Sequence, residues 1–285
     1  MNSPKSIRSV FTSAMLMAFL WGASSLSARA VVLVSDNFND AAGTNINGRN
    51  LPVGSAAWVV KPNESPDTLE IDGSGHLVTN FVGSSAPTAT VALNAGNYNQ
   101  YAIEATVNLA SKTDVSVWGL GFDKNPNSFY VYSELTLQLR PNKTSNQLEL
   151  DGPYDPTGAS GHKTIALAMA SIPDFDPATT YNIKLVYNAV NSTASVLVNG
   201  ATIMDGIAVV DVNGNSYSPN LNYAEICYIT PKATGDNTLS QVWTDDFSVT
   251  AMNVPEPASL GWLGLFVIGG GVMLARRRVA ARSAR

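Results

Sequence analysis

The sequence predicts an all-β fold for residues 31–253, in the form of a sandwich of two antiparallel sheets. No run of a dozen residues there places apolar side chains at helical spacing. Apolar and polar residues alternate instead over many short runs, as in strands with one buried face. Asn-Gly pairs at 47–48, 199–200 and 213–214 interrupt these runs, and Asn-Gly favours the tight turns that join antiparallel strands.

The alternation predicts about a dozen short strands in order along the chain. It is clearest in residues 101–109, where apolar side chains occupy every odd position, and in residues 135–139, where three leucines alternate with Thr and Gln. Residues 165–169 repeat the pattern. The other predicted strands are 56–60, 68–71, 76–82, 88–93, 115–122, 128–132, 181–187, 194–198, 223–230 and 241–250.

The stretch from Tyr181 to Gly200 predicts a hairpin. Its two apolar-alternating runs flank a turn at 189–193, and the second run closes on Asn199-Gly200. The stretch resembles the Tyr-x-Ile/Leu-x-Leu-x-Tyr … Val-x-Val-x-Asn-Gly hairpin of laminin-G and concanavalin-A-like jelly rolls. Those domains commonly open on an Asp-Asn-Phe run and close on Asp-Asp-Phe-Ser-Val, as residues 36–38 and 245–249 do here. The resemblance implies a jelly roll whose first and last strands pair at one edge.

Two other architectures agree with the same strands. One is a different β-sandwich, and the other is a pair of smaller sandwiches divided near Gly152 and Gly161. Residues 31–253 are numerous enough to bury the core of one large domain or of two small ones.

Residues 1–30 have the form of a secretory signal peptide. Lys5 and Arg8 precede an apolar stretch at 10–23, and Ala28-Arg29-Ala30 supplies a small-x-small cleavage pattern. We therefore predict export by the Sec machinery, removal of the segment by signal peptidase, and a mature chain that begins near Val31. An uncleaved N-terminal anchor is the alternative.

Residues 258–275 predict one transmembrane helix. The segment carries no charged residue, and at ~1.5 Å rise per residue it reaches about 27 Å, enough for the core of a bilayer. The cluster Arg276, Arg277 and Arg278 follows directly, and basic residues beside a span stay on the cytoplasmic side. The preceding domain is therefore expected on the periplasmic side of the inner membrane.

Pro255, Glu256 and Pro257 stand just before this span. The two prolines disfavour a helix and extend the tripeptide, which makes it accessible to a processing enzyme. Residues 254–285 resemble the PEP-CTERM sorting signal of Gram-negative bacteria, because the Pro-Glu-Pro motif, the span and the arginine cluster occur in the same order. The resemblance implies recognition by an exosortase in species that secrete exopolysaccharide, and a final place at the outer surface or in the extracellular matrix. A plain single-span anchor is the alternative.

Charge and cysteine content exclude several functions for the exported domain. Residues 31–253 contain nine Lys and Arg against 21 Asp and Glu, a balance of −12. Such an acidic domain is not expected to bind nucleic acid, and it suits neutral sugars or divalent cations better than anionic polymers. Cys227 is the only cysteine, so the chain has no internal disulfide, and its apolar strand predicts a buried side chain.

The acidic residues do not predict catalysis. Retaining polysaccharide hydrolases use two carboxylates about 5 Å apart, which one strand can present as Glu-x-Asp-x-Glu. Glu70-Ile71-Asp72 and Glu149-Leu150-Asp151 each lack the third acid, and the second pair stands beside a Gly-Pro turn. His76 and His162 have no carboxylate at ligand-like spacing and are expected at solvated or edge positions.

We expect no cofactor, with a structural calcium as the one candidate. Asp36, Asp245 and Asp246 would converge if the first and last strands pair, and carboxylate oxygens are calcium ligands. The alternative is that these acids end strands and accept hydrogen bonds from turn amides. Asp211-Val212-Asn213-Gly214-Asn215 has the spacing of a calcium loop but lacks the following helix and Glu, so we interpret it as a turn.

Sugar binding requires aromatic faces beside hydrogen-bonding groups. Trp118 and the pair Tyr130 and Tyr132 lie in predicted strands and are the candidate glycan-binding residues, if their strand faces are exposed. The alternative is that all three belong to the core.

These observations predict an exported, exosortase-sorted protein whose jelly-roll domain binds a glycan or matrix component without catalysis. A structural or adhesive matrix protein without a small-ligand site is the second hypothesis. A divergent polysaccharide hydrolase or lyase is the third. The functional expectation rests partly on the fold, which many unrelated functions share.

Overall fold

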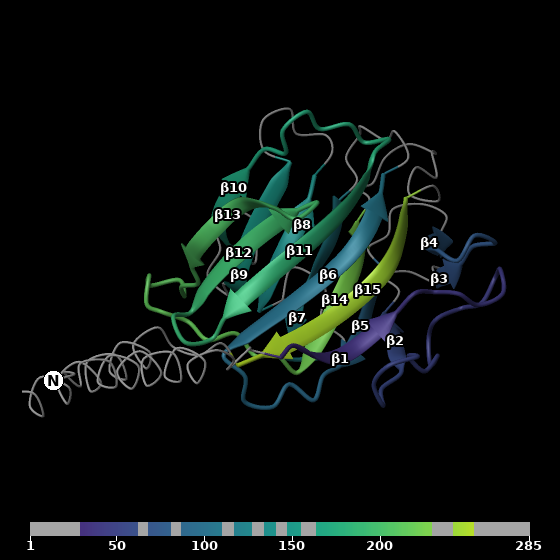
Figure 1. The fold of residues 1–285 in the computed structure, drawn as a ribbon, viewed down its shortest axis with the longest axis horizontal. Helices are drawn as coiled ribbons and strands as arrows, with labels where there is room; N and C mark the ends of the chain where they lie inside the picture. Colours follow the sequence, from purple (N-terminus) through teal and green to yellow (C-terminus); the bar gives the residue numbers. More distant parts are fainter. Residues whose placement is uncertain are drawn as a thin grey trace, which may run out of the picture. The chain divides into compact units, whose positions relative to one another are not determined.

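Two antiparallel β-sheets enclose one hydrophobic core in the computed structural model (Figure 1). The structure describes residues 29–61, 68–80, 87–109, 117–126, 134–140, 147–154, 164–229 and 242–253. Residues 30–252 form one compact unit. The predicted two-sheet antiparallel sandwich is confirmed, because every strand ladder in the described ranges is antiparallel.

The described residues form fifteen strands. In chain order these are β1 (Val31–Asp36), β2 (Trp58–Lys61), β3 (Thr68–Ile71), β4 (Leu77–Asn80), β5 (Thr88–Ala92), β6 (Gln100–Asn108), β7 (Val117–Asp123), β8 (Leu135–Leu139), β9 (Leu148–Tyr154), β10 (Thr164–Ala170), β11 (Thr180–Asn188), β12 (Thr193–Val198), β13 (Ala201–Ala208), β14 (Tyr223–Ile229) and β15 (Trp243–Met252).

The two sheets interleave distant parts of the chain. The first sheet has the order β13-β12-β11-β6-β15-β4-β3, with β1 also paired to β15, and the second has the order β10-β9-β8-β7-β14-β5-β2. The last strand, β15, thus lies in the middle of the first sheet, between β6 on one side and β4 and β1 on the other (Figure 1). Such pairing requires both halves of the chain at once. The alternative of two smaller sandwiches divided near Gly152 and Gly161 is wrong, because residues 30–252 form one compact unit and Gly152 lies inside β9.

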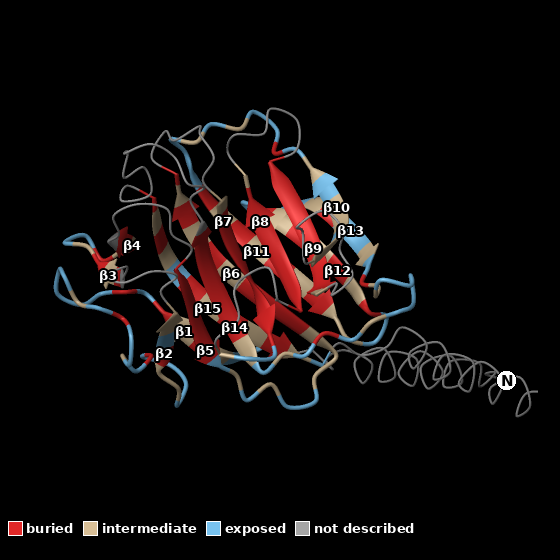
Figure 2. Cartoon of the chain, turned by 180° about the vertical axis from the view of Figure 1, so that it is seen from behind, coloured by how far each residue is buried: buried red, intermediate tan, exposed pale blue. Residues whose placement is uncertain are grey.

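Burial follows the predicted alternation in the first sheet but not in the second. In β11 every second residue from Tyr181 to Tyr187 is buried, as expected for a strand with one face in the core. In β7, β8 and β9 almost every residue is buried, so both faces of these strands are covered (Figure 2). This difference decides where a ligand can reach the domain.

The first and last strands pair, as the jelly-roll resemblance predicted. Asp36 in β1 lies opposite Phe247 in β15, and the pairing continues to Val31 and Ala251. The same side of β15 pairs with β4 through Trp243 and Thr244, so β1 and β4 share one edge of this strand.

The predicted hairpin from Tyr181 to Gly200 is also confirmed. β11 and β12 pair from Asn188 opposite Thr193 to Ile183 opposite Val198. Asn199 and Gly200 then turn the chain into β13 with φ values of 50° and 79°. Both angles lie in the left-handed region that Asn and Gly tolerate, which explains why this dipeptide occurs here.

The strand ranges predicted from alternation did not include β1, β9 or β13. β1 and β13 have irregular alternation and bulged pairing, which weakens the period-two pattern. β9 contains Gly152 and Pro153, residues that we interpreted as a turn. Its edge partner β10 pairs with it through two register shifts, and such bulges accommodate residues that a regular ladder would exclude.

Several predictions fall outside the described residues. These are the signal peptide, the strand at 128–132, the sorting tail at 254–285 and its span at 258–275. In the ranges that the structure does describe, no helix is long and apolar enough to cross a membrane.

Candidate functional site

The second sheet carries polar side chains on the face opposite the core. Leu135, Leu137 and Leu139 of β8 point into the core, so Thr136 and Gln138 point the other way. The polar face is defined here as Thr136, Gln138, Glu149, Asp151 and Glu225, from β8, β9 and β14. Each of these residues is at most 5% exposed, so their polar groups must find partners within the protein.

A hydrogen-bonded network joins most of the polar face. The Arg140 guanidinium forms an ion pair with Glu149, with 2.6 Å between Nη1 and Oε2. Its Nε and Nη2 donate to Gln138 Oε1 at 3.2 and 3.0 Å. The Gln138 amide in turn donates to the Asp151 carboxylate. The side chain of Gln138 is therefore fixed at both ends between β9 and the arginine.

Asp151 is the most perturbed carboxyl group of this network. Burial, and after it the negative charge of Glu149, raise the pKa of Asp151 to about 7, although Arg140 and Thr164 act in the opposite direction. A carboxyl group with such a pKa can hold or release a proton near neutral pH. Its surroundings are nevertheless closed, since its neighbours on β8 and β9 are buried as well.

Two glycines of β7 bring the neighbouring strands together over the polar face. Thr136 on β8 donates its hydroxyl to Glu225 Oε1 on β14 at 3.1 Å, although β7 lies between the two strands. A Cβ on Gly121 would lie 2.8 Å from Thr136 Cα, and one on Gly119 would lie 2.8 Å from Cys227 Sγ. Close approach of the neighbouring strands therefore explains why glycine occupies both positions.

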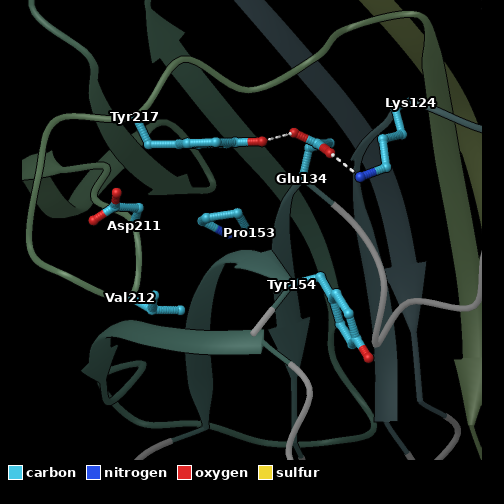
Figure 3. A pocket seen from close by; sticks show the side chains of 7 residues that line it. All are labelled: Lys124, Glu134, Pro153, Tyr154, Asp211, Val212 and Tyr217. Carbon is cyan, nitrogen blue, oxygen red and sulfur yellow. Dashed lines mark hydrogen bonds and ion pairs between the residues drawn. The ribbon is translucent and has the colours of Figure 1, made fainter. Parts of the chain in front are cut away.

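A cavity opens instead at one end of the second sheet, and we call it the end pocket (Figure 3). Its volume is about 160 Å³. The pocket lies where β7 ends, β8 begins and β9 ends, and the segment between β13 and β14 completes it. Its lining residues are Lys124, Glu134, Pro153, Tyr154, Asp211, Val212 and Tyr217.

Glu134 organises one wall of the end pocket. Its carboxylate lies between Lys124 and Tyr217 (Figure 3). Lys124 Nζ is 3.2 Å from Oε1, whereas Oε2 accepts hydrogen bonds from the Tyr217 hydroxyl and, at 3.1 Å, from the Asn220 backbone NH. Burial and the adjacent Glu134 carboxylate raise the pKa of Tyr217, so its hydroxyl remains a donor. The buried carboxylate thus fastens the segment before β14 to the sheet.

Asp211 and Val212 form the opposite rim. Asp211 Oδ1 accepts hydrogen bonds from the backbone NH groups of Asn213 and Asn215 at 2.8 and 2.9 Å. These hydrogen bonds, led by the one from Asn215, lower the pKa of Asp211. The interpretation of residues 211–215 as a turn is confirmed, because the carboxylate closes its own loop.

Of the three predicted glycan-binding residues, the structure places only Trp118, and it corrects that prediction. Trp118 is fully buried in the core, and its Nε1 donates to Thr244 Oγ1 at 2.9 Å. A ring in this position cannot stack on a sugar, so the alternative core assignment holds for Trp118. Tyr130 and Tyr132 lie outside the described residues.

The predicted calcium ligands are not assembled as a metal site. Both Asp36 oxygens are already occupied by Arg49, by the Trp58 indole NH at 2.7 Å and by the Phe38 backbone NH at 2.9 Å. Across the described residues, no three His, Cys, Asp or Glu side chains lie close enough to hold a metal ion. The structure thus shows no calcium site at Asp36, Asp245 and Asp246, because the Arg49 guanidinium already supplies a positive charge at Asp36.

Other candidates occupy structural positions. His76 stacks on Trp243 with 4.1 Å between ring centroids and contacts Asp72 at 3.0 Å, as expected for an edge-packed histidine. Cys227 is fully buried, as predicted, and burial raises the pKa of its thiol, with Glu225 and Asp151 acting the same way. His162 and the sorting residues Pro255, Glu256 and Pro257 and Arg276, Arg277 and Arg278 lie outside the described residues.

Sequence reasoning missed the end pocket altogether. Its residues come from four separate segments and share no spacing motif. The one available signal was Glu134, an acidic residue directly before the apolar strand at 135–139. A charge at that place is nearly always solvated, so only the tertiary structure distinguishes this buried carboxylate.

Comparison with known proteins indicates the fold. No protein-family model matches the sequence, and no curated protein matches it. The carbohydrate recognition domain of Emp47p is similar in structure, with a TM-score of 0.51, 13% identity, and coverage of 81% of this chain and 100% of that chain. A Bacillus subtilis protein described as having a galectin-like fold has a TM-score of 0.45 and 13% identity, over 77% of this chain and 99% of that chain.

A sialidase is similar at a TM-score of 0.44 and 10% identity, over 79% of this chain. This chain spans only 19% of the length of that sialidase. At 13% identity the likeness to the Emp47p domain is one of fold. The part of the chain that the structure describes is an all-β jelly-roll sandwich, as predicted.

Proposed function

We propose that this protein binds a glycan without catalysis, at the outer cell surface or in an exopolysaccharide matrix. In this proposal the Sec machinery exports the chain, the C-terminal span holds the precursor in the inner membrane, and an exosortase processes the tail. The signal peptide, the Pro-Glu-Pro motif, the span and the arginine cluster of the sequence support export and sorting. The fold supports glycan binding only in a general way, because a carbohydrate recognition domain adopts it too.

The end pocket is the observation that carries the binding proposal. It combines the side chains of Tyr154 and Tyr217 with the apolar Pro153 and Val212, and it adds the ammonium group of Lys124. Sugars present both apolar ring faces and hydroxyl groups, so their sites combine aromatic surface with a few placed hydrogen-bonding groups. The five residues of the polar face are each at most 5% exposed, whereas the Lys124 side chain in the end pocket is 49% exposed.

The engagement of the carboxylates supports a non-catalytic role. Glu134 in the end pocket accepts from two donors and pairs with Lys124, which leaves it poorly suited to act as a general acid. One observation favours the hydrolase or lyase hypothesis, namely the raised pKa of Asp151 beside Glu149. That pair lies on the buried polar face, so we rank catalysis below the two non-catalytic roles.

The test is retention of the full-length protein, purified in detergent, on a glycan array and on polysaccharide affinity gels. We expect retention that falls when Lys124→Ala alters the end pocket and remains when Lys184→Ala removes the matched ion pair with Glu104 on the other sheet. Absence of retention on every glycan would favour the structural or adhesive role. Release of reducing ends from any polysaccharide would favour catalysis.

A further inference from the structure

We propose that the end pocket accepts one uncharged pyranose ring, so that the protein recognises a single neutral sugar residue and not an extended stretch of polysaccharide. This inference rests on the proposed glycan-binding function and specifies the class of ligand. It follows from three properties of the pocket: its size, the groups that remain available to a ligand, and its charge.

The size of the end pocket matches one ring. At about 160 Å³ it is close to the ~150 Å³ engineered cavity that holds a benzene molecule in another protein. Pockets for drug-sized ligands are larger, roughly 300–1,000 Å³. A six-membered sugar ring therefore fills the available volume, and a second residue would have to lie outside it.

The hydrogen-bonding groups of the pocket favour a ligand that accepts hydrogen bonds. Both oxygens of Glu134 are engaged, by Lys124 on one side and by Tyr217 and Asn220 on the other. Asp211 likewise uses Oδ1 for two backbone NH groups and Oδ2 for the Asn215 amide at 3.2 Å. The Lys124 side chain is 49% exposed and carries three donors, so it is the group best placed to bind a ligand oxygen.

Charge then separates neutral from acidic sugars. The formally charged side chains of the lining are Lys124, Glu134 and Asp211, a balance of −1. Because Glu134 already compensates Lys124, a ligand carboxylate would meet Asp211 without a cation of its own. The surrounding exported domain, at −12, adds long-range repulsion of polyanions. A neutral sugar carries no carboxylate, so it avoids repulsion both by Asp211 and by the net negative charge of the domain.

Isothermal titration of the full-length protein in detergent tests this inference. The probes are the methyl glycosides of glucose, galactose and mannose, the corresponding uronates, and neutral oligosaccharides of two to six residues. We expect at least one neutral methyl glycoside to bind with a Kd on the order of millimolar. Extending that sugar to an oligosaccharide should improve the Kd by less than about tenfold, because the added residues lie outside the pocket.

Two variants locate the site. Lys124→Ala should weaken binding about tenfold or more, whereas Lys184→Ala should not change it. Since Lys124→Ala could also disturb Glu134, Val212→Trp provides a second test at a residue that is 46% exposed. A tryptophan there should fill the pocket and abolish binding without lowering Tm.

The outcomes separate the two levels of the proposal. A gain of about tenfold or more on chain extension, tighter binding of a uronate than of its neutral sugar, or binding that survives Val212→Trp would overturn the single-residue inference and leave glycan binding intact. Failure of every glycan to bind would overturn the proposed function itself.

Discussion

The Thr136 hydroxyl donates to the Glu225 carboxylate at 3.1 Å across an intervening strand. The contact exists because β7 has Gly121 at the crossing point, opposite both Thr136 and Glu225 in the two ladders. Polar side chains from β8 and β14 thus meet directly above the backbone of β7, which lies between these two strands.

Gly121→Ala should destabilise the domain strongly. Its Cβ would lie 2.8 Å from both Thr136 Cα and Thr136 Oγ1, and the main-chain atom cannot move aside easily. We expect a loss of about 2–3 kcal/mol in the free energy of unfolding, measured by chemical denaturation. Gly73→Ala is the control, because a Cβ there meets only Ala42 at 3.9 Å. Equal stability of the two variants would contradict the close approach.

Asp151→Asn should remove a pH dependence of stability. The folded-state pKa of about 7 lies above the ordinary value of about 3.9, so the folded protein binds more protons between these two pH values. The contribution of this group is therefore fully present below about pH 4 and is lost as pH rises through 7, by up to about 4 kcal/mol.

The asparagine side chain does not titrate, so the gain in Tm of Asp151→Asn over the wild type should be small near pH 4 and largest near pH 8. Asp205→Asn makes the same change at an exposed place on β13 and serves as the control. A difference that is constant over this pH range would show that Asp151 is ionised throughout.

Asp36 and Asp40 allow a buried and an exposed partner of the same arginine to be compared. Both carboxylates bind Arg49, but the Asp36 side chain is fully buried whereas that of Asp40 is 45% exposed. Asp36→Ala should cost about 3 kcal/mol, because it leaves the Trp58 NH without its acceptor and removes the buried carboxylate from the Arg49 guanidinium, which keeps only the exposed Asp40. Asp40→Ala should cost less than about 1 kcal/mol.

The same experiment in EDTA and in millimolar calcium decides the role of Asp36. We expect equal losses in both buffers, since the partner of Asp36 is Arg49. A loss on Asp36→Ala that appears only with calcium present would assign the carboxylate to a metal ion instead.

Replacing Pro255, Glu256 and Pro257 by alanines should block processing of the tail. The variant should accumulate as an uncleaved membrane protein in a host that contains an exosortase, as seen by the size of the protein in membrane fractions. The control replaces Met252 and Asn253, just before the motif, by alanine. Normal release of the Pro-Glu-Pro variant would contradict recognition by an exosortase.

Much of the sandwich could be predicted because its strands follow a local rule. In β11 and β12 the alternation of apolar and polar residues reports burial directly, since one face of that sheet is in the core. The rule fails in β7, where Trp118 and its neighbours are buried on both faces. When both faces of a strand are buried, the alternation of polar and apolar residues no longer indicates which residues are exposed.

Sequence patterns could not predict the partners of the charged residues. Asp36 was a plausible calcium ligand until Arg49, thirteen positions later, was found to occupy it. Glu149-Leu150-Asp151 lacks the third acid of a catalytic strand motif, and the structure shows that Glu149 and Asp151 join Arg140 and Gln138 in a buried network. Each of these pairings depends on strand register, which local spacing does not determine.

Local patterns in the sequence were enough to predict the all-β class, the Asn199-Gly200 turn and the burial of Cys227. The pairing of the first and last strands was implied by the resemblance to jelly rolls. The sequence also supplied every argument for export and sorting. The folded structure was needed to place Trp118 in the core, to show that Glu134 binds Lys124 and Tyr217, and to show the cavity at the end of the second sheet. The physical reason is that burial, charge pairing and cavities arise between segments distant in the chain, where no periodicity connects the residues involved.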